Sequence, residues 1–67
     1  MRTILADPLR RHHLEHAIAS LLREGYEIVA QSEFRADLVR RRRGFFARKE
    51  RIRLEVDTYG HVHRATL

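Results

Sequence analysis

The segment from Asp7 to Gly25 constrains the fold most, because it carries both ends of one helix and a single apolar stripe. Asp7 is a favourable N-cap, and Pro8 suits the first helical position, where a missing N–H costs nothing. Gly25 predicts the stop, as a left-handed residue after the last turn. The apolar residues that recur at three- and four-residue spacing are Leu9, Leu14, Ala17, Ile18, Leu21 and Leu22. We therefore predict a helix from about Pro8 to Glu24 that needs an apolar partner surface.

Two strands are expected to follow the helix and to supply part of that surface. Residues 26–34 are rich in β-branched and aromatic side chains, and residues 36–41 continue as a second strand. A tight connection near residues 32–35 would make the pair a hairpin. The residues expected to face the helix are Tyr26, Ile28 and Ala30 in the first strand, and Ala36 and Leu38 in the second.

A second hairpin is predicted near the end of the chain. Residues 51–57 alternate cleanly, with Ile52, Leu54 and Val56 on one face and charged side chains on the other. The sequence from Asp57 to Gly60 is typical of a type I turn with a left-handed glycine, and residues 61–66 form the last strand. With Asp57 opposite His61, Val56 would face Val62 and Glu55 would make a cross-strand polar contact with His63.

These elements predict one small α+β domain over residues 1–67. An N-terminal amphipathic helix would pack on one face of a 3–4-stranded antiparallel sheet, in the order α-β-β-β-β. The face for the helix would consist of Ile28, Ala30, Leu38, Ile52, Leu54, Val56 and Val62. Five further apolar residues do not fit on it, namely Val29, Phe34, Val39, Phe45 and Phe46. They suggest a second buried surface, most simply a homodimer contact, and residues 1–6 could add an edge strand.

The charge of the chain is concentrated in one stretch. Residues 40–53 hold eight cations against one anion, Glu50, whereas the whole chain of 67 residues has a net charge of +5. A concentrated positive edge on a near-neutral body suits an anionic partner such as nucleic acid or acidic lipid. Arginine favours bidentate phosphate contacts, although a bias toward arginine can also reflect genomic base composition.

The stretch 40–50 is predicted to be a basic loop or hairpin tip. If the second strand ran on, Arg40 and Arg42 would follow Leu38 onto the core face, and burying an unpaired guanidinium is prohibitive. A projecting arm with two aromatic residues has the parts used in nucleic-acid binding, where cations hold phosphates and aromatics stack on bases. A solvated hairpin tip is the alternative. The candidate anion-binding residues are Arg40, Arg41, Arg42, Arg43, Phe45, Phe46, Arg48 and Lys49.

Other chemistry has weak support in the sequence. His12 and His16 lie one helical turn apart, and His61 and His63 share a strand face, so each pair has a spacing that could chelate zinc or nickel. No third ligand is specified, and two solvated faces explain the pairs as well. No glycine-flanked nucleophile or glycine-rich phosphate loop is present. We expect a non-catalytic protein without a cofactor or a small-molecule substrate.

Composition narrows the class further. The chain has no cysteine, which excludes disulfides and thiolate metal sites. No apolar run approaches the ~20 residues of a spanning helix, and the first six residues are too short for a signal peptide. We therefore expect a soluble, cytoplasmic protein.

A resemblance to a family rests on two stretches of the chain. Gly25-Tyr26-x-Ile28-Val29-x-Gln31-Ser32-x-x-x-Ala36-x-Leu38-Val39-Arg40, and later Glu55-Val56-Asp57-x-Tyr59-Gly60-x-Val62, resemble small, mostly uncharacterised bacterial membrane proteins. In those proteins a cytoplasmic helix and hairpin precede a membrane-spanning segment, and a final hairpin with a valine-aspartate-x-x-glycine turn follows it. The resemblance covers residues 10–66 and implies no enzymatic activity.

The chain departs from that family where the spanning segment would lie. Only Gly44-Phe45-Phe46-Ala47 stands there, so the chain is either a soluble relative or has lost a membrane segment between residues 44 and 49. In the second case the flanking arginines would be juxtamembrane cations at the inner face of a membrane. Two functions therefore remain open: a nucleic-acid-binding module that acts through its basic loop, and the soluble portion of a membrane-associated or protein-binding protein.

Overall fold

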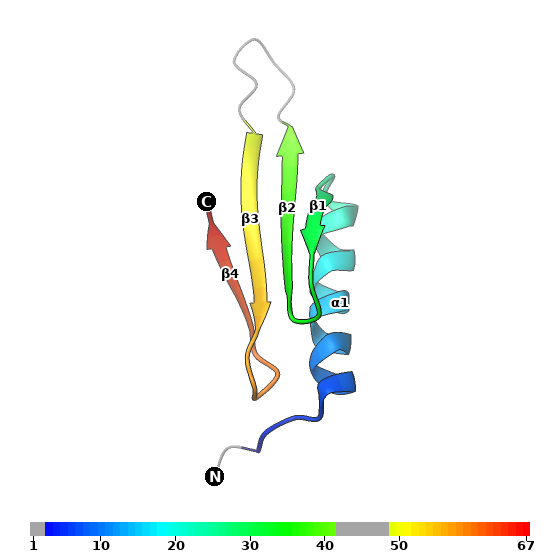
Figure 1. Ribbon diagram of the computed structural model, residues 1–67. Helices are drawn as coiled ribbons and strands as arrows, with labels where there is room; N and C mark the ends of the chain where they lie inside the picture. Colours follow the sequence, from blue (N-terminus) through cyan, green and yellow to red (C-terminus); the bar gives the residue numbers. More distant parts are fainter. Residues whose placement is uncertain (1–2, 42–48) are drawn as a thin grey trace.

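The computed structural model describes residues 3–41 and 49–67, which form one helix packed on a four-stranded antiparallel sheet (Figure 1). The elements are α1 (Asp7–Arg23), β1 (Glu27–Gln31), β2 (Arg35–Arg41), β3 (Lys49–Val56) and β4 (Val62–Thr66). The strands lie in the order β1-β2-β3-β4, and each neighbouring pair is antiparallel. The predicted α+β fold and its element order are therefore confirmed, with four strands in the sheet.

The two ends of α1 differ in how well the sequence predicted them. Ala6 is the N-cap, so the prediction that Asp7 caps the helix is wrong. The Asp7 carboxylate instead accepts a hydrogen bond from Arg10 at 3.3 Å, and a negative charge in the first turn is favourable for the helix dipole. Gly25 has a φ of 96°, and the N–H of Tyr26 donates to the Leu21 carbonyl at 3.1 Å. This is the predicted left-handed glycine end.

The core lies between α1 and the sheet. Its buried residues are Leu14, Ile18 and Leu21 of α1, then Tyr26, and Ala36, Leu38, Ile52, Leu54 and Val56 of the central strands. The predicted helix stripe was too wide, because Leu9 and Leu22 are 51% and 45% exposed. Leu22 lies at the border of the buried stripe, whereas Leu9, five positions before Leu14, points well away from it at 3.6 residues per turn.

A bulge in β1 changes the face that one of its residues occupies. Ile28 lies opposite Leu38, but the next paired residue is Ala30, opposite Asp37, so that Val29 is the extra residue. Because an extra residue reverses the alternation of a strand, Ala30 shares the outward face with Asp37. The prediction that Ala30 lies on the helix-facing side together with Ile28 is therefore wrong.

Phe34 was expected to lie outside the core, but it packs against the core cluster. The N–H of Val56 donates to the Phe34 carbonyl at 3.0 Å, which brings this residue beside a buried position of β3. From α1, the guanidinium carbon of Arg10 lies over the Phe34 ring, 3.8 Å from its centre. Phe34 thus closes one end of the core.

The segment before α1 forms no strand in residues 3–6, so the predicted extra edge strand is wrong for them. The N–H of Leu5 donates to the Thr58 carbonyl at 2.9 Å, and its side chain covers the turn between β3 and β4. Gly60 has a φ of 84° in that turn, and a Cβ atom there would collide with the Leu5 side chain. The register beyond the turn is as predicted, with Val56 opposite Val62.

Candidate functional site

The sheet has one face covered by α1 and an opposite face on which no described element packs. On that open face β3 presents a cation at every second position: Lys49, Arg51 and Arg53. Their neighbours Ile52 and Leu54 point into the core, so the alternation of the strand turns all three cations outward. We call these three residues the β3 cation row.

The members of the β3 cation row differ in their partners. Arg53 donates from Nε to Asp37 Oδ1 at 2.9 Å and from Nη2 to Oδ2 at 3.4 Å. This hydrogen bonding lowers the pKa of Asp37 and raises the pKa of Arg53, so both groups are charged at neutral pH. Lys49 and Arg51 are exposed and have no ion pair within the described part of the chain.

Charge on the open face is therefore uneven along the strands. Toward the β3–β4 turn the cations are matched, since Arg35 lies 3.1 Å from Glu55 and Arg53 is held by Asp37. Toward the start of β3, Lys49 lies opposite Arg41 of β2 in the register, and the two strands lead into the arginine-rich connection. The unmatched positive charge of the described face thus lies at this end.

A shallow groove of about 740 Å³ runs over the same end of the open face. Its charged lining comes from the β3 cation row, from Asp37 and Arg40 of β2, and on the β1 side from Glu24 and Glu27. Val29 of β1 and Val39 of β2 give it an apolar lining on one side of the β3 cation row, and Leu67, beside Arg51 on the β4 side, gives one on the other. The groove therefore combines a line of cations with an apolar surface beside it.

Arg40 has a different environment from the other predicted anion-binding residues. Its Nη2 lies 2.7 Å from Glu50 Oε2, its Nη1 donates to the Glu24 carbonyl at 3.3 Å, and its guanidinium carbon lies 4.7 Å from the centre of the Tyr26 ring. The hydrogen bond with Glu50 raises the Arg40 pKa. The guanidinium on the helix side of β2 is thus paired, as the cost of burial requires.

The other predicted site residues are only partly visible. Arg41 pairs with Lys49 in the β2–β3 ladder. Arg42, Arg43, Phe45, Phe46 and Arg48 lie outside the described residues, and their role stays a prediction. Arg51 was missing from the predicted anion-binding residues, although the alternation over residues 51–57 already placed it on the charged face.

The histidines are not arranged as a metal centre. In residues 3–41 and 49–67, no group of three or more His, Asp or Glu side chains could hold a metal ion. His12 and His16 lie exposed on α1, whereas His61 and His63 lie beside the β3–β4 turn. His63 is opposite Glu55 in the register, but its Nε2 contacts Asp57 Oδ2 at 2.8 Å, and Glu55 pairs with Arg35.

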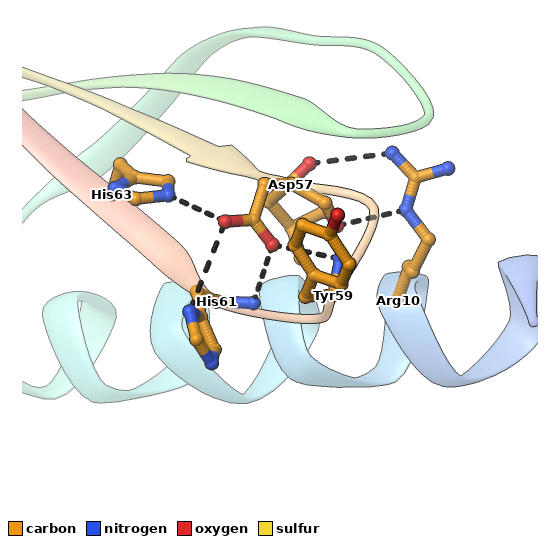
Figure 2. A network of polar contacts seen from close by, with 6 residues as sticks. Arg10, Asp57, Tyr59, His61 and His63 are labelled. Atoms are coloured by element: carbon orange, nitrogen blue, oxygen red, sulfur yellow. Dashed lines mark hydrogen bonds and ion pairs between the residues drawn. The ribbon is translucent and has the colours of Figure 1, made fainter. Parts of the chain in front are cut away.

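Asp57 organises the β3–β4 turn (Figure 2). Its Oδ1 accepts hydrogen bonds from the backbone N–H groups of Tyr59 and His61, each at 2.9 Å. The His63 contact and these two bonds lower the pKa of Asp57 to about 2. Arg10 of α1 donates from Nε to the Asp57 carbonyl at 3.0 Å, which ties the helix to the same turn. The cluster is a structural junction between α1 and the second hairpin.

The low pKa of Asp57 predicts an acid-dependent loss of stability. Its folded pKa of about 2 lies below the ordinary aspartate pKa of 3.8, so its stabilising contribution is complete above about pH 4 and is lost as the pH falls through about 2. Asp57→Asn keeps an acceptor oxygen but removes the charge. We expect this variant to melt below the wild type at pH 7, and the difference in Tm to shrink from about pH 4 downward. Thermal melts followed by circular dichroism measure it, and a difference that stays constant into this range would contradict the assignment.

No protein-family model, characterised protein or solved structure matches this chain. The class of the protein is therefore defined by its architecture, one helix on a four-stranded antiparallel sheet with an open, partly cationic face. Among the described residues, no helix is both long and apolar enough to cross a membrane.

Proposed function

We propose that this protein is a non-catalytic, cytoplasmic module that binds nucleic acid through the cationic end of its open sheet face. The observation that carries the proposal is the pair of exposed cations, Lys49 and Arg51, which make no ion pair within the described part of the chain. In the sequence, the connection between β2 and β3 adds the further cations Arg42, Arg43 and Arg48. Cationic donors of this kind hold phosphates through charge-assisted hydrogen bonds, and a donor without an ion pair gives up no partner to do so.

The structure also supports this surface over the helix as the place of binding. On α1 the exposed arginines alternate with acidic residues, and Arg11 lies 3.4 Å from Glu33. A surface with both signs interspersed has little attraction for a polyanion, whereas a one-sided cluster raises the local concentration of anionic ligands. At Lys49 and Arg51 the open face presents two neighbouring cations of one strand that make no ion pair among the described residues.

The test is fluorescence anisotropy with labelled single-stranded RNA and duplex DNA over about 0.05 to 0.2 M salt. We expect micromolar binding at low salt that weakens steeply as salt rises, because each phosphate that the protein neutralises releases counterions. Lys49→Ala/Arg51→Ala should weaken binding about tenfold or more at about 0.1 M salt, with a salt slope lower by about 1.4 for a single strand.

The matched control is Arg23→Ala/Arg64→Ala, which removes the same charge from exposed positions outside the groove. This variant should lose less than about threefold in affinity, since only its long-range field changes. Equal losses of affinity in the two double variants would mean that binding depends on the net charge of the protein and not on this site. Absence of binding by the wild type, together with binding to vesicles that contain phosphatidylserine, would favour the membrane-associated alternative and overturn the proposal.

A further inference from the structure

The β3 cation row has a spacing that suits one kind of nucleic acid. Alternate residues on a strand lie about 6.6–6.8 Å apart, so the row is a straight line of three positive side chains on one strand. Successive phosphates along an extended single strand are spaced comparably and can follow a straight path. In a duplex they follow a helical path that soon leaves a flat sheet face. The row therefore fits the backbone of a single strand.

The apolar part of the groove points to the same ligand. Val29, Val39 and Leu67 line the groove beside the β3 cation row, and Val29 and Leu67 are 62% and 60% exposed. A single strand can place its sugars and base faces against such a surface, whereas a duplex keeps its base faces inside. Positively charged grooves that follow the backbone of a single strand are a recurring form of this recognition.

Asp37 hinders phosphate binding at one member of the β3 cation row, Arg53. It lies in the same groove and holds Arg53 through two hydrogen bonds, at 2.9 Å and 3.4 Å. Its carboxylate places a negative charge beside the path of the phosphates, and it occupies the donors that a phosphate would need. The pair is still accessible, with 37% of the Arg53 side chain and 26% of the Asp37 side chain exposed, so a phosphate can reach the guanidinium and replace the carboxylate.

Resting on the function proposed above, we propose that the ligand is a single strand of RNA or DNA whose phosphates lie along Lys49, Arg51 and Arg53, and that Asp37 competes with those phosphates for Arg53. The carboxylate is thus an internal substitute for a phosphate. It lowers the affinity of the free protein, and a bound strand must displace it from the guanidinium.

The experiment compares Asp37→Asn with Glu33→Gln by anisotropy on a labelled single-stranded oligonucleotide. Both variants remove one negative charge, but Glu33 lies on the β1–β2 connection, outside the groove. We expect Asp37→Asn to bind roughly three- to tenfold more tightly than the wild type, with a salt slope steeper by about 0.7. Glu33→Gln should change the affinity less than twofold.

A second substitution tests whether the gain passes through Arg53. Adding Arg53→Gln to Asp37→Asn should remove the gain and return the salt slope to that of the wild type. Thermal melts of every variant would confirm that binding is measured on folded protein. If the wild type binds no nucleic acid, the proposed function and this inference both fall. If the wild type binds but Asp37→Asn behaves like Glu33→Gln, or the gain survives Arg53→Gln, or duplex DNA gains as much as the single strand, only this inference falls.

Discussion

Replacing Leu38 with alanine is expected to remove a large part of the free energy of unfolding of the protein. Leu38 lies in the middle of β2 with no exposed surface, and it pairs with Ile28 on one side and Ile52 on the other. Removing a buried leucine side chain costs about 2–5 kcal/mol, because the lost burial is joined by a cavity. A domain of this length has a total stability of only about 3–10 kcal/mol. The change therefore removes a large part of what holds the fold.

Urea denaturation followed by circular dichroism measures this effect, and Val29→Ala is its control. Val29 is an apolar residue of the neighbouring strand, but it is 62% exposed in the bulge, so its truncation should change the free energy of unfolding by no more than about 0.5 kcal/mol. If the two variants unfold at the same urea concentration, the core does not lie between α1 and the sheet as described.

Much of this fold could be predicted because its signals are local. The left-handed Gly25 ends α1, and the strict alternation of Ile52, Leu54 and Val56 identifies β3 and its buried face. Asp57 and Gly60 define a turn short enough to fix the register, so Val56 could be placed opposite Val62 from the sequence alone. Each of these features depends on residues within a few positions of one another.

The features that escaped prediction depend on contacts between distant segments. The bulge at Val29 reflects how β1 pairs with β2, and no residue type in the sequence marks it. Phe34 is drawn toward the core by a hydrogen bond with Val56, 22 positions away. Leu22 looked like part of the helix stripe, but whether it is covered depends on where the sheet lies under α1. Periodicity predicts the direction in which a side chain points, but not how far the surface that would cover it extends.

The candidate site also has features that the sequence predicts and features that it does not. Alternation alone turns Arg51 and Arg53 outward, and the composition of residues 40–53 predicts a cationic surface. Which cations are free to bind could not be predicted, because the ion pairs of Arg53 with Asp37 and of Arg40 with Glu50 depend on the register between β2 and β3. That register is set across a connection with no turn signal as clear as that of the second hairpin.

Replacing Arg10 with leucine is expected to destabilise the protein by about 2–4 kcal/mol, a large effect for a charged residue on a helix. The Arg10 side chain is only 15% exposed, and it donates to the carbonyls of Val56 at 3.4 Å and Asp57 at 3.0 Å (Figure 2). Its guanidinium also stacks on the Phe34 ring. Leucine keeps most of the apolar volume but leaves two carbonyls at the end of β3 without this donor.

Arg11→Leu is the matched control, because it removes the same functional group from the next position of α1. Arg11 is about half exposed and makes one ion pair with Glu33 at 3.4 Å, which is worth about 0–1 kcal/mol. Thermal and urea denaturation should therefore place Arg10→Leu well below the wild type and Arg11→Leu close to it. Equal losses would mean that Arg10 contributes no more than a surface charge. In that case the β3–β4 turn would be held against α1 mainly by Leu5 and by the packing of α1 on the core.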